Sequence, residues 1–305
     1  MIEKERRVII VTDAAADLPS EQGLRTKFGV GPIKQVPLFV DFGTDRFIIG
    51  KSDGIYQSIN NDIFRERIDR EKRNKSGVIP KTAAPNETYF DEVYKEPIEQ
   101  GYDVVSVHIS KELSATLGSA TNASKKIDGN RVSIFDTQSV SMAQGLMAIR
   151  AEKMAANGAT KEEILEMLVD MRERTTLRAV TPNFPFLKES GRVPMVTAMI
   201  GSVLSLVPIL RIDHITEESK VQKMAVVRRE GKAVEWAEDF LSKGKTPEQV
   251  AIVDFEAAEI TDKLVRKLVE NQLVSKERIY RGDLGPVTGS HGGPGTWVMV
   301  TVREK

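Results

Sequence analysis

The sequence predicts an α/β protein of two domains: an N-terminal three-layer domain around a parallel sheet, and a C-terminal α+β domain with a mixed sheet. Short apolar segments alternate with amphipathic helical segments up to about residue 174, an order typical of a parallel sheet covered on both faces. The pattern becomes less regular after residue 178, and 305 residues are enough for two domains of ordinary size. We expect the domains at residues 1–165 and 166–305.

In the first half, strands and helices are expected to follow each other in turn. The first apolar run leads directly into Thr12-Asp13 and a turn, which is how a buried parallel strand ends before a helix. A capping box from Thr160 to Glu163 predicts the start of a later helix. The expected strands lie at residues 7–11, 35–40, 46–49, 103–109 and 131–135, and the expected helices at 87–99, 116–126, 140–157 and 164–174.

Residues 60–75 differ from the rest of this half because ten of them are Arg, Lys, Asp or Glu. The apolar residues in the segment are Ile63, Phe64 and Ile68. We interpret the segment as a solvated helix or an insertion, and the alternative is an arm that docks a partner.

In the second half, residues 193–210 form the longest apolar stretch, in which methionine and branched residues mix with small ones. Such a stretch is ordinarily a buried core helix, but flexible methionines beside small residues could instead line a channel for an alkyl chain. The candidate lining residues are Met195, Met199, Ile200, Val203 and Leu204. The expected strands lie at residues 179–182, 209–212, 224–227, 249–255, 279–281 and 296–302, and the expected helices at 231–241 and 260–271.

Composition narrows the classes of function. The chain is 40% hydrophobic and 29% charged, as in globular proteins, and its 44 Lys and Arg balance 44 Asp and Glu. We therefore expect neither nucleic acid nor a membrane surface as a partner. The lack of cysteine excludes disulfides and thiolate metal sites. Because no signal peptide and no apolar run of spanning length is evident, we expect a cytoplasmic protein without a membrane span.

Four segments place hydroxyls or an imidazole where the backbone turns. The first is Thr12-Asp13, and the second holds Thr82 between two prolines that keep its backbone extended. The third is the turn of Ser114, just before a helix, and the fourth is a glycine-rich loop at residues 289–295 around His291. Glycine is favoured where the backbone passes close to another group, so this loop suits contact with a ligand. Taken singly, each residue also fits a turn, a helix cap or a surface histidine.

Together these residues would make a receptor for one anionic head group. A helix N-terminus supplies unpaired N–H donors and partial positive charge, which suit a carboxylate or a phosphate. If the apolar stretch lines a channel, each buried methylene of an alkyl chain contributes about 0.8 kcal/mol. The tail would then supply most of the affinity, and the polar residues would fix the head group.

The same residues allow a different class of function, a lipid hydrolase or acyltransferase. Ser114 would be the nucleophile, His291 the base, and Asp13 or Asp136 the residue that orients the base. The turn around Ser114 lacks the G-x-S-x-G elbow of α/β-hydrolases, which argues against this alternative. A protein with only a structural or interaction role is a third option.

Metal and nucleotide chemistry have no support in the sequence. The three histidines, His108, His214 and His291, are far apart, and no carboxylate cluster offers the spacing of metal ligands. Neither a G-x-x-x-x-G-K-[ST] nor a G-x-G-x-x-G loop is present. We expect no metal and no cofactor.

Five motifs, in order along the chain, resemble those of the DegV family. They are Thr12-Asp13 with Asp17-Leu18-Pro19, Thr82 with Pro85, Ser110-x-x-Leu113-Ser114-x-Thr116-x-x-Ser119-Ala120, Phe186-Leu187-Lys188-x-x-Gly191-Arg192, and Gly285-Pro286-Val287-x-Gly289-x-His291-x-Gly293-Pro294-Gly295. Some positions differ from the family pattern: Ala14 replaces a serine, Ala115 a glycine, Leu117 a tyrosine and Gln222 a common arginine.

The resemblance implies two α/β domains with a lipid site between them, where one long-chain fatty acid lies in a tunnel. It implies a non-catalytic carrier in phospholipid metabolism that presents the acid to the ATP-binding subunit of a fatty acid kinase, which forms the acyl-phosphate. Carried over by position, Thr82, Ser114 and Ala115 would bind the carboxylate, with His291 close to it. Arg192 would lie near the mouth, facing the head group or the partner.

Overall fold

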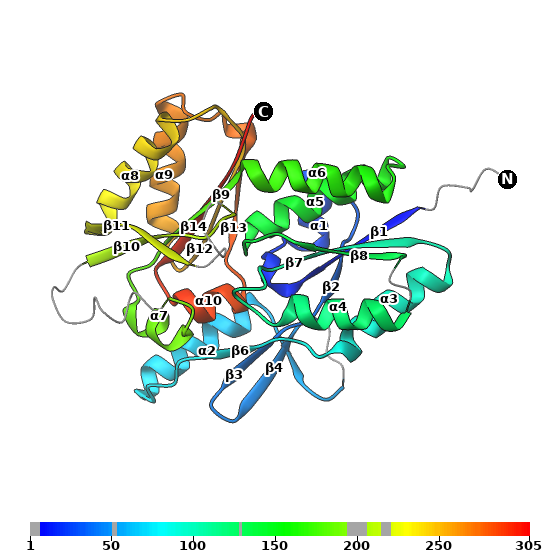
Figure 1. The fold of residues 1–305 in the computed structure, drawn as a ribbon. Helices are drawn as coiled ribbons and strands as arrows, with labels where there is room; N and C mark the ends of the chain where they lie inside the picture. The colour runs from blue at the N-terminus through cyan, green and yellow to red at the C-terminus, as the bar shows by residue number, and fades with distance from the viewer. Residues whose placement is uncertain (1–6, 51–53, 128–129, 194–205, 215–220) are drawn as a thin grey trace.

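The computed structural model describes residues 7–50, 54–127, 130–193, 206–214 and 221–305. Three sheets organise these residues (Figure 1). Sheet A has the strand order β2-β1-β7-β8, sheet B the order β5-β4-β3-β6, and sheet C the order β11-β10-β9-β14-β12-β13. The predicted class is confirmed: the first half contains a parallel sheet and the second half a mixed one.

Sheet A is parallel and is covered by helices on both faces. Its strands are β1 (Val8–Asp13), β2 (Lys34–Val36), β7 (Asp103–His108) and β8 (Val132–Asp136). Its helices are α3 (Glu87–Glu99), α4 (Thr116–Ile127), α5 (Met142–Ala156) and α6 (Lys161–Arg174). Alternate residues of β1 point to opposite faces, so Val11 packs with α3 and α4 while Ile10 packs with α5 and α6. The capping box predicted at Thr160 is present.

Sheet B was not predicted as a separate unit. Its strands are β3 (Phe39–Phe42), β4 (Asp45–Ile49), β5 (Gln57–Ile59) and β6 (Lys81–Ala83). The single strand expected at residues 35–40 is wrong, because the chain leaves sheet A after Val36 and enters sheet B at Phe39. Pro37 lies at this break, and proline has no N–H to donate to a sheet.

Sheet C carries helices on one face, and its other face turns toward the first half of the chain (Figure 1). Its strands are β9 (Thr175–Val180), β10 (Leu206–Arg211), β11 (Gln222–Arg228), β12 (Pro247–Phe255), β13 (Ile279–Asp283) and β14 (Thr296–Arg303). The covering helices are α8 (Glu230–Ser242) and α9 (Ala258–Glu270). The strand expected at residues 179–182 instead begins at Thr175. The first part of this strand was not predicted because Arg178 is charged. In the structure this buried cation is neutralised by Asp213 at 2.6 Å.

Further helices and helical turns complete the described chain. They are η1 (Ala14–Ala16), α1 (Glu21–Gly23), η2 (Leu24–Phe28), α2 (Asn61–Asn74), α7 (Phe184–Ser190), η5 (Lys276–Arg278) and α10 (Pro286–Gly292). The loop expected at residues 289–295 is therefore partly wrong, since its first half is the last turn of α10. The predicted domain boundary at residues 165/166 lies within α6 and stays a prediction.

A buried chain of hydrogen bonds joins α3 to sheet A. The Tyr94 hydroxyl donates to Ser106 Oγ at 2.8 Å, and Ser106 Oγ lies 2.6 Å from His108 Nε2. His108 Nδ1 lies 2.8 Å from Asp13 Oδ2, which also accepts the backbone N–H of Ile109. The first four side chains have no exposed surface, so they stabilise the fold and cannot meet a ligand from solvent.

We predict that Tyr94→Phe lowers the free energy of unfolding by about 1 kcal/mol, because it deletes one hydrogen bond of this chain. Urea denaturation measures the loss. Tyr102→Phe, on a partly exposed ring, is the control and should change the value by less than about 0.5 kcal/mol. Equal stability of Tyr94→Phe and the wild type would contradict the assigned role.

Candidate functional site

A cavity of about 240 Å³ lies where the three sheets meet. Its wall includes Thr82, Ser114, Ala115, Arg192 and His291, the residues singled out from the sequence as a head-group site. They come from segments as much as 209 residues apart. The candidate tunnel residues Met195, Met199, Ile200, Val203 and Leu204 lie outside the described residues.

Thr82 and His291 meet directly. Thr82 lies in the middle of β6, whose extended backbone pairs with β3 at Val40, as its flanking prolines predicted. His291 lies in the last turn of α10, and its Nε2 is 2.8 Å from Thr82 Oγ1. Burial, and to a smaller extent the nearby cation of Arg192, lower the pKa of His291 from 6.5 to about 4. The imidazole is therefore neutral at pH 7 and can offer either a proton donor or an acceptor.

Ser114 occupies the turn between β7 and α4. Its Oγ accepts the backbone N–H of Thr116 at 3.3 Å and lies 2.8 Å from Thr116 Oγ1, so Ser114 caps the start of α4. The N–H groups of the first helical turn lack intrahelical acceptors, which directs donors and partial positive charge toward this end of the cavity. Ala115, beside it, is exposed.

Arg192 ties the segment after α7 to the turn of Ser114. Its Nε donates to the carbonyl of Leu113 at 3.4 Å, and its Nη1 donates to the carbonyl of Ser190 at 2.7 Å. The side chain is exposed while still lining the cavity. Because Ala115 and Arg192 are exposed, the polar end of the cavity is accessible from outside in the part of the chain that the structure describes.

The remaining wall is mostly apolar and buried. Three neighbouring strands of sheet C each contribute residues two positions apart, which is the spacing of side chains on one face of a strand. They are Leu177 and Ala179 in β9, Leu210 and Ile212 in and just after β10, and Thr296 and Val298 in β14. Sequence reasoning missed these residues, although their alternation within each strand was a readable signal.

A second polar cluster, also missed, holds the start of α10. Asp17 accepts hydrogen bonds from Ser141 Oγ at 2.5 Å, the Gly285 backbone N–H at 2.9 Å and Thr288 Oγ1 at 2.9 Å. Asp17 and Ser141 both have positive φ, at 49° and 58°. Burial raises the pKa of Asp17 to about 7, although the three hydrogen bonds lower it. Ser141 and Thr288 line the cavity, so this cluster belongs to its wall.

Three of the residues named for the alternative hydrolase have other hydrogen-bond partners in this structure. The partner of His291 Nε2 is Thr82, and Ser114 Oγ is engaged with Thr116. Asp13 is bonded to His108. Nor do the described residues contain a group of three or more His, Cys, Asp or Glu that could hold a metal ion.

Comparison with known proteins decides the family. A family model described as "Uncharacterised protein, DegV family" matches residues 7–304. The chain belongs to the DegV family. This confirms the resemblance inferred from the motifs. A DegV domain-containing protein of Deinococcus radiodurans is 28% identical over 290 residues, which cover 94% of this chain and 95% of that protein.

Solved DegV structures share the whole fold. A DegV family protein of Thermus thermophilus, described as fatty acid binding, is 29% identical with a TM-score of 0.81 and covers 98% of this chain and 100% of its own. A Thermotoga maritima protein described as having a fatty acid binding function is 25% identical with a TM-score of 0.78, covering 97% and 99%. Among the described residues of this family member, no helix has the length and apolar character needed to cross a membrane.

We predict a pH-dependent effect of Asp17→Asn on stability. The pKa of Asp17 is raised from 3.8 to about 7, so the folded wild type holds a proton that the unfolded chain has lost between these values. The resulting stability is full below pH 3.8 and is lost as pH rises through 7. The free energy of unfolding of the wild type minus that of Asp17→Asn should fall by about 2 kcal/mol from pH 5 to 7.5.

Urea unfolding of both proteins across this range is the measurement. His291, whose lowered pKa has the opposite effect, is present in both proteins and cancels in the difference. A difference that stays constant with pH would show that Asp17 is ionised throughout.

Proposed function

We propose that the cavity binds one long-chain fatty acid, with its carboxylate at Thr82, Ser114, Ala115 and His291 and its alkyl chain along the buried wall. The observation that carries the proposal is the change of character along one cavity. Its polar end is exposed at Ala115 and Arg192, whereas its sheet C wall is mostly apolar and buried, with Leu177 at 0% exposure and Leu210 at 2%. A ligand with one charged end and a long apolar body matches that change.

The physical chemistry of each end supports this assignment. At the polar end, hydroxyls, a neutral imidazole and the start of α4 can donate hydrogen bonds to a carboxylate, and Arg192 adds a nearby cation. At the apolar end, each methylene removed from water contributes about 0.8 kcal/mol. The two DegV relatives described above as binding fatty acid make the same class of ligand the natural candidate.

We further propose that the protein is a carrier without catalytic activity. The exposed head-group end would present the carboxylate to the ATP-binding subunit of a fatty acid kinase, which would form the acyl-phosphate and so serve phospholipid metabolism. This step needs a reachable carboxylate, and exposure of Ala115 and Arg192 supports that access. Arg192 would contact the head group or the kinase. Because the kinase uses ATP, the proposal places the protein in the cytoplasm.

The double variant Thr82→Ala/Ser114→Ala tests the head-group site. We expect the dissociation constant for a fluorescent fatty acid, cis-parinaric acid, to rise about tenfold or more, because two hydrogen bonds to a charged group are lost. Fluorescence titration gives the constant. Thr121→Ala, on α4 and bonded to the Leu117 carbonyl, is the control and should bind as the wild type does. Unchanged affinity in the double variant would place the carboxylate elsewhere.

Mass spectrometry separates the carrier from the hydrolase or acyltransferase. Purified protein is denatured and analysed intact and after extraction. A carrier releases about one free fatty acid per chain without a covalent adduct, whereas an acyl group on Ser114 would establish the enzyme instead. Protein that neither purifies with lipid nor binds cis-parinaric acid would refute fatty acid binding.

A further inference from the structure

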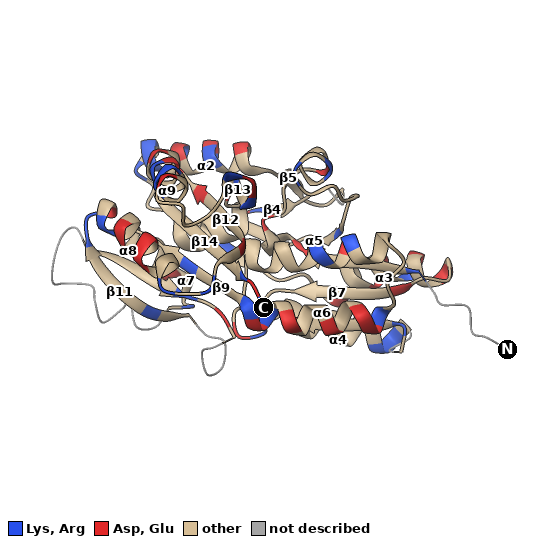
Figure 2. Cartoon of the chain, turned by 90° about the horizontal axis from the view of Figure 1, so that it is seen from above, with Lys and Arg blue, Asp and Glu red and all other residues tan. Residues whose placement is uncertain are grey.

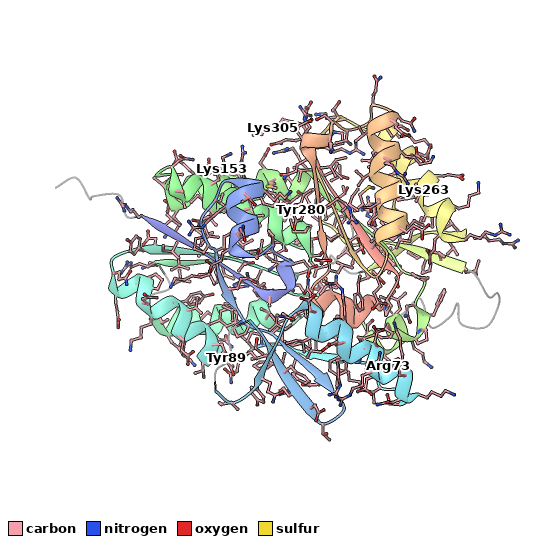
Figure 3. The ribbon with its side chains drawn as sticks, turned by 180° about the vertical axis from the view of Figure 1, so that it is seen from behind. Arg73, Tyr89, Lys153, Lys263, Tyr280 and Lys305 are labelled. Carbon is pink, nitrogen blue, oxygen red and sulfur yellow. The ribbon has the colours of Figure 1, made fainter. Side chains whose placement is uncertain are left out.

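The charged segment at residues 60–75 is helix α2, and it is more than a solvated surface. Figure 2 shows Lys, Arg, Asp and Glu along it, and Figure 3 shows Arg73 at its outer end. Two of its three apolar residues point inward: Phe64 is 1% exposed and Ile68 2%, whereas Ile63 is 43% exposed. The helix therefore has a narrow apolar edge that packs into the molecule beside α10 (Figure 1).

Phe64 contacts α10, which carries His291, and β3, the strand beside the one that carries Thr82. Its ring centroid lies 5.9 Å from that of Phe42 in β3, the strand that pairs with β6 and thereby holds Thr82. On another side it lies 5.3 Å from Phe255, the last residue of β12. It also touches α10: a Cβ added to Gly289 would lie 2.9 Å from Phe64 Cε1.

Ion pairs hold α2 to both sides of this junction. Arg67 contacts Asp45 of β4 at 2.7 Å and lies over the Phe42 ring at 5.2 Å. Arg65 contacts Asp283 at 2.6 Å, at the end of the strand that leads into α10. Exposed pairs of this kind contribute little to stability individually. They do fix the direction of the helix relative to sheet B and to the segment before α10.

We propose that Phe64 is a positioning residue for the head-group site. Its ring packs against β3 and α10 and thereby fixes the distance between Thr82 and His291. This inference rests on the proposed function for its meaning, since the pair is where the carboxylate would bind. The Thr82–His291 contact joins two elements that have no covalent link near the site. The ring, packed among Phe42, Phe255 and Gly289, supports α10 directly and β6 through its pairing with β3.

Gly289 allows a direct test of this role. Because glycine has no Cβ, α10 can lie close to the Phe64 ring at this residue. Gly289→Ala places a methyl group against Phe64 Cε1, and the packed ring cannot move aside without displacing its neighbours. We expect α10 to shift away from α2, His291 to gain water, and dissociation of cis-parinaric acid to accelerate about fivefold or more. Phe64→Leu in the Gly289→Ala background makes room for the methyl and should return dissociation to within about twofold of the wild type.

Two readouts are measured: the dissociation rate by stopped-flow fluorescence, and the titration of His291 by NMR, assigned with His291→Asn. In the wild type the His291 pKa lies near 4, so its signals should stay constant from pH 5 to 7. In Gly289→Ala they should titrate in this range, and they should return to constancy in the double variant. Gly231→Ala is the matched control, since a Cβ there meets open space in α8.

Each outcome decides one proposal. If Gly289→Ala changes neither readout, or Phe64→Leu fails to reverse its effects, Phe64 does not position the pair. If Gly289→Ala does not fold, Phe64→Leu alone decides, and dissociation no faster than in the buried control Phe90→Leu overturns the inference. If the wild type does not bind cis-parinaric acid, the proposed function fails, and the His291 titration still tests the positioning.

Discussion

The contact between Thr82 and His291 is the constraint on which the site depends. It joins an edge strand of sheet B to a short helix that connects two strands of sheet C, across 209 residues of sequence. Neither element is long enough to hold its own geometry: β6 has three residues and α10 has seven. Their positions come from packing and hydrogen bonds around them, with Phe64 on one side and the Asp17 cluster at the start of α10.

The turn after β1 contributes one aspartate to each of the two buried polar clusters, Asp13 to the first and Asp17 to the second. Asp13, at the end of β1, is directed inward and closes the hydrogen-bonded chain that runs through His108 to Tyr94. Asp17, four residues later, is directed toward α10 and the cavity wall. One short turn therefore anchors the core of sheet A and the helix that carries His291. The polar residues at the carboxyl end of this parallel strand therefore have structural partners in both parts of the chain.

Much of this could be predicted from the sequence, for identifiable reasons. Long periodic segments were predicted well, and the α3 helix has the expected bounds at residues 87–99. Thr82, Ser114 and His291 were singled out because hydroxyls and an imidazole lay at turns, and Arg192 because of the family resemblance; all four line one cavity. The roles assigned to them remain proposals. Asp17 was noted only within a motif, because its partners Ser141, Gly285 and Thr288 are distant in sequence.

The failures also have physical causes. A proline divided one apolar run between two sheets, and the buried Arg178–Asp213 pair concealed the first part of β9. The glycine-rich loop proved to be partly helical, because Gly289 lets α10 lie against an aromatic ring rather than bending the chain. The proline break is a local feature of the chain, whereas in the other two cases a tertiary contact overrode the local pattern.

The cavity changes from an exposed polar end to a buried apolar wall, and this change has a kinetic consequence for the proposed ligand. A fatty acid that enters through the exposed end inserts its methyl terminus first, and its carboxylate never has to cross the apolar region. Leaving requires the hydrocarbon to return to water, so each additional methylene that is buried should lengthen the residence time about fourfold. The residence time would then depend on chain length, and longer acids would stay bound long enough to be delivered to a partner protein that binds slowly.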